Sequence, residues 1–386
     1  MTAGEAVIDL AAIGTNVAIA RSLTDSMIMA VVKADAFGHG AVPVARAAVA
    51  HGAGWLGVAS PAEALALRAG GIEAPILSWL YPAATDLREA VAADITLSVA
   101  TAAQLDAVAR AAARVGRSAD VHLKIDTGLS RNGATLESWP ELVARARAAE
   151  RAGHVSVTSV WSHLVDADAE SGALVGTQIA RYTDAIAVAE SAGLRPVIKH
   201  LANSAGALHR PSTHFDMVRM GIGLYGVEPI PGHETGLRPV MTLRAPIVSL
   251  KSVHEGTGVS YHHDYVTRGR TRLALVPLGY ADGVPRSAGR YAQVWVGTER
   301  RPVAGRIAMD QFVVDVGIRA VEPDHVVVFG PGDRGEPTVT EWAAWAGTIP
   351  HEVLTGIGNR VERLYVGGDA ATRPSPVPAG EVARAR

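Results

Sequence analysis

Over its first 230 residues the chain alternates between short runs of apolar, β-branched residues and alanine-rich amphipathic segments, and this alternation restricts the possible folds more than any other feature. Strands that alternate with helices form a parallel sheet, because each helix returns the chain to the same end of the sheet. Eight strand-helix units are the number that closes a (β/α)8 barrel. The predicted strands are 27–35, 55–60, 74–80, 95–100, 120–126, 155–163, 197–203 and 217–226, and the predicted helices include 42–51, 61–69, 103–115, 141–152 and 177–192.

The pattern changes after a Pro- and Gly-rich stretch at 228–233, where the predicted helices end and strand runs follow one another. The sequence therefore predicts an α/β protein with an N-terminal (β/α)8 TIM-like barrel over 1–235 and a mostly β C-terminal domain over 236–366. Residues 367–386 are rich in Pro, Ala and Arg without periodicity, and we expect a disordered tail there. The strands predicted for the second domain are 246–253, 272–278, 292–296, 311–316 and 325–329.

The composition is typical of an enzyme for a small molecule. The 386 residues are 48% hydrophobic and 19% charged, with a formal net charge of -2 and no Lys/Arg-rich block, so we expect neither nucleic acid nor a membrane as a partner. The absence of cysteine excludes disulfides and thiol catalysis, and no metal-binding motif is evident. No leader-like segment and no apolar run of bilayer length is evident, so we expect a cytoplasmic protein.

Polar residues collect at the predicted C-terminal ends of the barrel strands, where barrel enzymes place their chemistry. Lys33 ends the first strand, and loss of hydration there lowers the pKa of its amine and leaves a neutral nucleophile that can form a Schiff base with an aldehyde. The alternative for any single lysine is a solvated strand end. The convergence of further polar residues on the same face favours an active site; these are residues 126–131, Ser162, His163, His200, Asn203, Ser204 and Arg219.

The segment around Lys33, VVKADAFGHG at 31–40, resembles the cofactor-lysine signature of the bacterial alanine racemases, which are pyridoxal phosphate enzymes built from a barrel and a β domain. The resemblance covers nearly the whole chain. It implies an isomerase that interconverts L- and D-alanine and supplies D-alanine for peptidoglycan precursors. Six further blocks match the family in family order: KIDTGLSR at 124–131, HLANS at 200–204, RMGIGLYG at 219–226, VSY at 259–261, LGYADG at 278–283 and GRIAMD at 305–310.

The resemblance implies two catalytic bases. Lys33 would bind the cofactor covalently and act as the base on one face of the substrate Cα, and Tyr261 would act on the opposite face. Tyr261 belongs to the predicted C-terminal domain. In the family this tyrosine, together with Met309 and Asp310, reaches into the site from a second chain, so the resemblance implies a homodimer with shared active sites.

The resemblance also implies how the cofactor, pyridoxal 5'-phosphate, is held. Arg219 would donate to the pyridine nitrogen, which stays an unprotonated acceptor because a guanidinium keeps its protons. His200 would support Arg219, and His163 would pack on the ring. The phosphate would be bound by Ser204 and by the backbone N–H groups of Gly221 and Ile222.

Four residues are implied to line the substrate pocket, namely Arg131, Tyr280, Met309 and Asp310. Family members can carry a carbamate on the lysine that corresponds to Lys124, and such a carbamate would orient Arg131. Three positions depart from the family pattern: Phe37 and His351 stand where tyrosines are usual, and His262 where glycine is common. The departures at Phe37 and His351 either weaken cofactor retention or enlarge the pocket, which would admit serine beside alanine.

Three other functions compete with this interpretation. A barrel decarboxylase of basic amino acids relies on a cysteine and on an acidic partner at the pyridine nitrogen, whereas this chain has no cysteine and offers Arg219. A non-catalytic paralogue that binds the cofactor or an inhibitor has no need for Tyr261. The run GIGLYG at 221–226 also matches a dinucleotide fingerprint, but no helix is predicted after it and no acidic residue follows at the required spacing.

Overall fold

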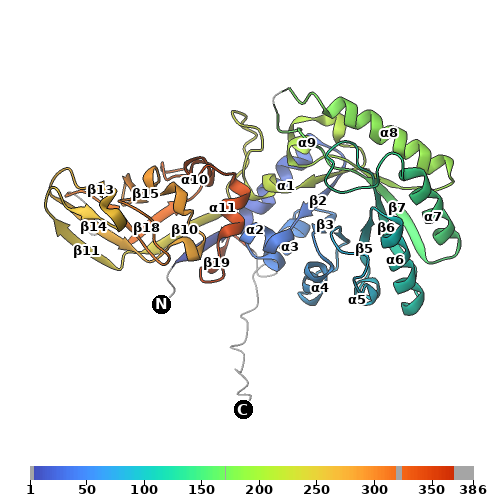
Figure 1. Ribbon diagram of the computed structural model, residues 1–386, viewed down its shortest axis with the longest axis horizontal. Helices are drawn as coiled ribbons and strands as arrows, with labels where there is room; N and C mark the ends of the chain where they lie inside the picture. Colours follow the sequence, from blue (N-terminus) through green and yellow to red (C-terminus); the bar gives the residue numbers. More distant parts are fainter. Residues whose placement is uncertain (1–3, 170, 319–323, 369–386) are drawn as a thin grey trace, which may run out of the picture.

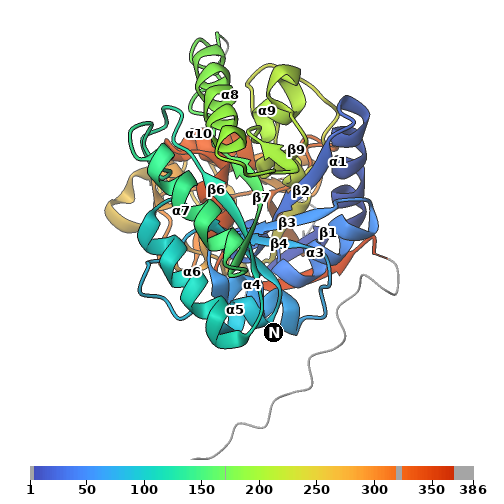
Figure 2. The ribbon, with the colours of Figure 1, turned by 90° about the vertical axis from the view of Figure 1, so that its right-hand side faces the viewer.

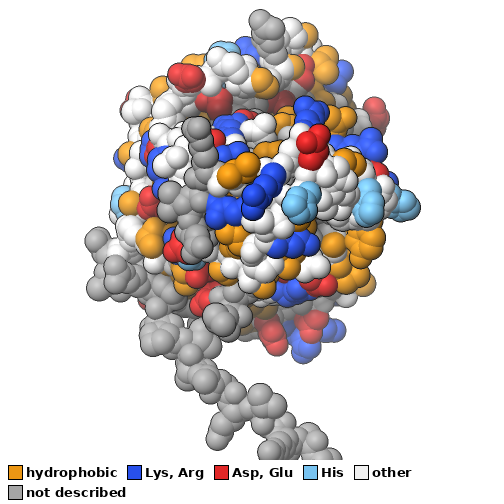
Figure 3. All heavy atoms as spheres, turned by 90° about the vertical axis from the view of Figure 1, so that its left-hand side faces the viewer, with side chains coloured by type: hydrophobic (Ala, Val, Ile, Leu, Met, Phe, Trp, Pro, Cys, Tyr) orange, Lys and Arg blue, Asp and Glu red, His pale blue; other side chains and the backbone are white. Residues whose placement is uncertain are grey.

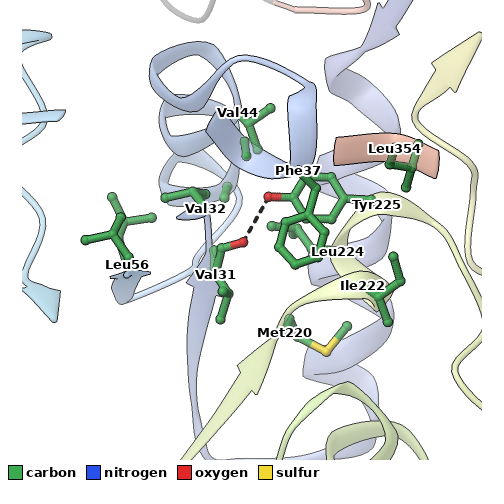
Figure 4. Packing of buried hydrophobic residues seen from close by; sticks show 14 of the residues in the cluster. Val31, Val32, Phe37, Val44, Leu56, Met220, Ile222, Leu224, Tyr225 and Leu354 are labelled. Atoms are coloured by element: carbon green, nitrogen blue, oxygen red, sulfur yellow. Dashed lines mark hydrogen bonds between the residues drawn. The ribbon is translucent and has the colours of Figure 1, made fainter. Parts of the chain in front are cut away.

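The computed structural model describes residues 4–169, 171–318 and 324–368, which form a barrel joined to an elongated second domain (Figure 1). Both parts contribute to one continuous hydrophobic core. Figure 4 shows a part of this core in which Phe37 and Tyr225 from the barrel meet Leu354 from the second domain. The two domains therefore pack on each other beside the segment that carries Lys33.

Eight parallel strands form the barrel, in the order β8-β7-β6-β5-β4-β3-β2-β9, and Figure 2 shows them end-on with helices outside. The sheet nearly closes between β8 and β9, where the backbone N–H of Asp216 donates to Lys199 O (3.0 Å) and that of Arg219 to Ala202 O (3.2 Å). Each predicted strand overlaps an observed one, so the predicted barrel is confirmed. The strands are β2 (Met27–Val31), β3 (Trp55–Val58), β4 (Ile76–Ser78), β5 (Ile95–Val99), β6 (Ala119–Lys124), β7 (Val155–Trp161), β8 (Ile198–His200) and β9 (Met217–Met220).

The five predicted barrel helices are present as α3 (Ala41–Ala50), α4 (Pro61–Ala69), α6 (Ala102–Val115), α7 (Trp139–Arg151) and α8 (Val175–Ser191). Three further helices were not predicted, namely α1 (Leu10–Leu23), α5 (Arg88–Ala92) and α9 (Ser204–His209). The start of α1 has a sequence signal, because Asp9 is its N-cap and accepts from Ala11 N at 2.9 Å. The other two helices have only five and six residues, too few to show a helical period.

The second domain is mostly β, as predicted. It contains a six-stranded sheet in the order β16-β15-β18-β10-β1-β19, a three-stranded sheet β11-β14-β17 and the pair β12-β13. Its strands are β1 (Glu5–Asp9), β10 (Met241–Pro246), β11 (Ser249–Val253), β12 (Gly258–Val259), β13 (Tyr265–Val266), β14 (Thr271–Val276), β15 (Gln293–Val296), β16 (Glu299–Pro302), β17 (Phe312–Asp315), β18 (His325–Phe329) and β19 (Glu362–Val366).

The first strand of the chain lies in this second domain. β1 pairs antiparallel with β10 and parallel with β19, so the predicted barrel range of 1–235 contains one strand that belongs to the other sheet. A five-residue run carries no information about partners more than 200 residues away, which is why the sequence did not place it.

The prediction that helices end near residue 235 is wrong. The second domain contains α10 (Val339–Ala346) and α11 (Pro350–Gly356), and α10 begins with a capping box between Thr338 and Glu341 that was visible in the sequence. Of the predicted tail, only 367 and 368 are among the described residues. Within the described part of the chain, no helix combines the length and the apolar character that a membrane span requires.

Candidate active site

Lys33 lies at the start of an unusual turn at the mouth of the barrel. The strand predicted to reach residue 35 ends at Val31, and the helical turn α2 (Lys33–Gly38) follows directly. Within α2, the four residues from Ala34 to Phe37 have φ between 51° and 54°, so the backbone winds left-handed without glycine. This conformation costs about 1–2 kcal/mol per residue, so the surrounding structure has to hold it.

The second domain of the same chain holds the end of this turn. Arg363 of β19 donates from Nε to Gly38 O at 3.1 Å. Its two terminal nitrogens donate to the carbonyl oxygens of Ile357 (2.6 Å), Gly358 (2.5 Å) and Val361 (2.7 Å). A side chain at Gly38 is excluded, because a Cβ there would lie 2.5 Å from Leu354 O. The guanidinium therefore ties the Lys33 turn to the segment between α11 and β19.

The Phe37 ring packs on Tyr225, with ring centroids 4.6 Å apart, and the Tyr225 hydroxyl donates to Val31 O at 2.9 Å (Figure 4). Both rings are buried, and Tyr225 belongs to η2 (Ile222–Tyr225), the short 3-10 helix that follows β9. Tyr225 of the GIGLYG segment thus contacts both the end of β2, which precedes Lys33, and the turn that follows Lys33. The segment does not open a long helix, which is the context that a dinucleotide fingerprint requires.

Four basic side chains influence one another at the mouth: Lys124 of β6, Arg219 of β9, Lys33 of α2 and Arg131 of the loop after β6. Burial, followed by the charge of Arg131, lowers the pKa of the Lys33 amine, in the direction that the sequence predicted. Burial, followed by the charges of Arg219 and Arg131, lowers the pKa of Lys124 to about 7. The Lys124 ammonium also lies 4.2 Å from the centre of the Trp161 ring. A site with this many cations attracts anionic groups such as phosphate and carboxylate.

Arg219 is a buried cation, and its hydrogen-bond partners among the described residues are carbonyl oxygens and imidazole rings. Its Nη2 donates to Ser162 O (2.9 Å) and Leu201 O (2.8 Å), and the same atom lies 3.1 Å from His163 Nδ1. Burial lowers its pKa to about 10, which leaves it charged at neutral pH. No carboxylate lies within 4.0 Å of Arg219 among the described residues, so an aromatic nitrogen acceptor would fit this cation well.

A second histidine, which the sequence did not single out, supports His200. His200 Nε2 lies 3.1 Å from His122 Nδ1, and both rings are fully buried. The His200 ring also stacks on Trp161 at 5.3 Å with an interplanar angle of 5°. His122 lies on β6 and His200 on β8, and only the strand register shows that they meet.

Ser204 begins α9, and its hydroxyl oxygen accepts from Gly221 N (2.8 Å) and Gly223 N (3.2 Å). Asn203 caps the same helix by accepting from Gly206 N at 3.0 Å. A Cβ on Gly221 would lie at ordinary van der Waals distance from Ser204 Oγ (3.7 Å) and Phe37 Cζ (3.8 Å), so a side chain there would fill the place between the serine hydroxyl and the phenyl ring. The glycine therefore leaves a small cradle beside the Ser204 hydroxyl, and a hydroxyl that can donate there is suited to a phosphate group.

Gln178 of α8 organises the loops after β6 and β7. Its side-chain amide donates to Thr127 Oγ1 and to His163 O, both at 3.0 Å, and its oxygen accepts from Val165 N at 2.9 Å. Gln178 is buried on the inner face of this helix, and only the structure shows that burial, because the sequence gives no reason to place a glutamine there.

Two of the positions that depart from the family pattern lie beside Lys33. The Phe37 and His351 rings have centroids 5.8 Å apart, and the Lys33 ammonium lies 6.0 Å from the centre of the Phe37 ring. Burial and then the charge of Lys33 lower the pKa of His351, which also places this imidazole near the amine. His262 lies elsewhere, in η3 (Tyr261–His263) of the second domain.

The predicted site residues of the second domain do not join the barrel group within one chain. Tyr261 precedes β13, which lies at the end of the molecule away from the barrel (Figure 1). Figure 3 views this end and shows hydrophobic, basic and histidine side chains together on its surface. Tyr261 is 65% exposed, Met309 53% and Tyr280 43%, and Asp310 accepts from Arg360 at 2.8 Å. Among the described residues, no hydrogen bond or ion pair joins these four to the barrel site.

A (β/α)8 barrel that continues into a β domain and gathers several cations and a lysine of lowered pKa at its mouth has the architecture of a barrel enzyme with a site for anionic groups. Two family descriptions match the chain: the alanine racemase N-terminal domain over 8–229 and the alanine racemase C-terminal domain over 240–365. The chain belongs to the alanine racemase family, and it is an isomerase.

Individual alanine racemases match this chain over nearly their whole length. An alanine racemase from Frankia casuarinae is 51% identical over 94% of this chain and 96% of its own. The crystal structure of alanine racemase from D-cycloserine-producing Streptomyces lavendulae is 49% identical with a TM-score of 0.95, covering 97% of this chain and 100% of the other. The alanine racemase of Streptomyces coelicolor A3(2) is 50% identical with a TM-score of 0.92, covering 95% and 98%.

Proposed function

We propose that this enzyme interconverts L- and D-alanine with pyridoxal phosphate, using Lys33 and Tyr261 as bases on opposite faces of the substrate Cα. The observation that carries the proposal is the Lys33 amine, whose pKa burial and Arg131 lower, at the mouth of a barrel lined by Lys124 and Arg219. An amine with a lowered pKa is neutral more often and can both attack an aldehyde and accept a proton.

The residues present fit the cofactor that the family uses. The cradle in front of Gly221 and the Ser204 hydroxyl would hold the phosphate, and the buried Arg219 would donate to the pyridine nitrogen. When bound, pyridoxal phosphate withdraws electrons from the Cα–H bond of an amino acid. Because Arg219 donates without giving up its proton, it restrains this withdrawal, which favours return of the proton to Cα.

The two bases would come from two chains. Tyr261, Tyr280 and Met309 are exposed aromatic or apolar side chains, and such residues on one surface favour contact with another protein. In a homodimer the partner's Tyr261 would reach the face of Cα opposite Lys33, and Arg131 would bind the substrate carboxylate. Lys33 would then remove or return the Cα proton on one face of the substrate, and the phenol of the partner's Tyr261 would do so on the opposite face.

The test is incubation of the full chain and pyridoxal phosphate with L-alanine in D2O, followed by chiral analysis. We expect deuterium at Cα and formation of D-alanine. A protein that binds the cofactor but exchanges no Cα proton would be a binding paralogue and would contradict the proposal. We also propose that the enzyme acts in the cytoplasm to supply D-alanine for peptidoglycan precursors; deletion of its gene should then impose a requirement for D-alanine.

A broader substrate range is the second candidate, because Phe37 and His351 lie together beside Lys33. Replacement of two phenols by a phenyl and an imidazole ring removes two hydroxyl groups from the neighbourhood of Lys33, which would leave more room for a substrate side chain. We expect measurable racemisation of L-serine, and lower serine turnover relative to alanine in the variant Phe37→Tyr/His351→Tyr. Undetectable serine turnover under conditions where alanine reacts readily would remove this candidate.

A further inference from the structure

The carboxylate of Glu63 bridges the Lys33 turn and the neighbouring barrel loop. Its Oε1 accepts from Ala34 N at 2.8 Å, and its Oε2 accepts from Ala59 N (2.8 Å) and Ser60 N (2.9 Å). Glu63 lies in the first turn of α4, which follows β3, and β3 pairs with β2, the strand that leads to Lys33. Three backbone donors from two loops therefore converge on one side chain.

Capping of α4 does not explain all of these contacts. A capping box requires one carboxylate oxygen on the N-cap amide, here that of Ser60, whose own hydroxyl accepts from Glu63 N at 3.2 Å. The other oxygen of Glu63 is directed to Ala34, which belongs to a different loop. In the equivalent box at α10, the second oxygen of Glu341 instead binds Arg300.

Ala34 is where the strain of the turn begins. It is the first of the four left-handed residues and follows Lys33 directly, so the orientation of its peptide group sets the direction in which the Lys33 side chain leaves the backbone. The carboxylate of Glu63 accepts the N–H of this same peptide group. Loss of that acceptor would remove one of the contacts that oppose relaxation of the peptide toward the favoured right-handed region.

We propose that Glu63 is a positioning residue for Lys33, which fixes the start of the left-handed turn and places a negative charge near the amine. The inference rests on the proposed role of Lys33 as the cofactor lysine. The charge has its own effect, because Glu63 opposes the lowering of the Lys33 pKa that burial and Arg131 cause. The Glu63 side chain thus affects both the backbone geometry next to Lys33 and the pKa of the Lys33 amine.

Two measurements on the full chain test this without turnover. Amide hydrogen exchange reports the Ala34 peptide group, and the pH dependence of Lys33 acetylation by acetic anhydride, in protein freed of cofactor, reports its amine. In Glu63→Ala we expect the Ala34 amide to exchange about tenfold faster or more, since a bond to a charged acceptor is lost. In Glu63→Gln, which keeps the shape and removes the charge, we expect the apparent pKa of Lys33 to fall below that of the wild-type enzyme.

Ser60→Ala is the matched control. It removes the other half of the same capping box and leaves the Glu63 contact to Ala34 in place. Should Glu63→Ala fail to fold, Glu63→Gln still tests the charge. The proposal is overturned if the Glu63 variants leave Lys33 titration and Ala34 exchange unchanged, or if Ser60→Ala changes both equally. If the wild-type enzyme lacks racemase activity while these effects are present, the proposed function fails and the positioning role stands.

Discussion

Arg219 Nη1 lies 3.0 Å from His200 Nδ1, and this contact determines the protonation of two buried imidazoles. A guanidinium can only donate, so His200 accepts on Nδ1 and carries its proton on Nε2. That proton is donated to His122 Nδ1 at 3.1 Å, which in turn leaves the His122 proton on Nε2. Both rings are therefore neutral, and Arg219 can keep its remaining donors for the ligand and the carbonyl oxygens around it.

The neutral histidines make the protein sensitive to acid. Burial lowers the pKa of His122 from 6.5 to about 3, with Arg219 adding to the effect, and it lowers the pKa of His200 in the same direction. Between about pH 6.5 and pH 3 the unfolded chain binds protons that the folded chain does not, so the free energy of unfolding falls as pH falls. In urea unfolding, we expect the free energy of unfolding to fall less between pH 7 and pH 5 for His122→Asn than for the wild-type enzyme. Exposed His254 is the control, and an equal change in His254→Asn would contradict this account.

Arg363 should contribute to stability through geometry more than through charge. The variant Arg363→Met loses four hydrogen bonds to carbonyl oxygens, and we expect the free energy of unfolding to fall by about 2–4 kcal/mol. Arg363→Lys should not restore it, because an ammonium cannot reach acceptors in this forked arrangement. Arg301→Met, which removes a surface pair with Glu299, should cost less than about 1 kcal/mol. Urea unfolding measures the free energy of unfolding of all three variants. A wild-type value in Arg363→Lys would contradict this role of the Arg363 guanidinium.

Ser204 tests the phosphate cradle. If its hydroxyl donates to the phosphate, Ser204→Ala should raise the Kd for pyridoxal phosphate by about tenfold or more, the effect of a lost bond to a charged group. Ser191→Ala, at the exposed end of α8, should leave the Kd unchanged. Absorbance titration of cofactor-free protein gives both values. An unchanged Kd in Ser204→Ala would place the phosphate elsewhere.

Lys124 is suited to carbamate formation, because a pKa of about 7 leaves much of its amine neutral at physiological pH and only the neutral amine reacts with carbon dioxide. The product is an anion, which would relieve the repulsion among Lys33, Arg131 and Arg219. With 13C-bicarbonate we expect a carbamate signal in the NMR spectrum that is lost in Lys124→Met. The signal should persist in Lys251→Met, since Lys251 is an exposed residue of β11. Retention in Lys124→Met would assign the signal to another amine.

The barrel was predictable because each of its strands is a local apolar run and because helices separate them. The site was predictable to the extent that it follows strand ends: Lys33, His200, Ser204 and Arg219 all lie at the barrel mouth, where a β/α barrel gathers such residues. Their roles came from the family resemblance and stay predictions until tested.

What could not be predicted depends on contacts between distant segments. The left-handed turn after Lys33 contains alanines and a phenylalanine, which favour other conformations, and it is held by Glu63 and by Arg363, the latter 325 residues from Gly38. The pairing of His122 with His200 depends on the register of three strands. α10, in contrast, was missed despite a clear capping signal at Thr338 and Glu341.

The central claim is that each active site combines Lys33 of one chain with the partner's Tyr261. Lys33→Ala and Tyr261→Phe should each be inactive in racemisation when expressed alone. Co-expressed in equal amounts, they should recover about a quarter of wild-type activity, since about half of the dimers are hybrids and each hybrid has one intact site of two. If both bases acted within a single chain, no mixture would recover activity, and that result would contradict the shared site.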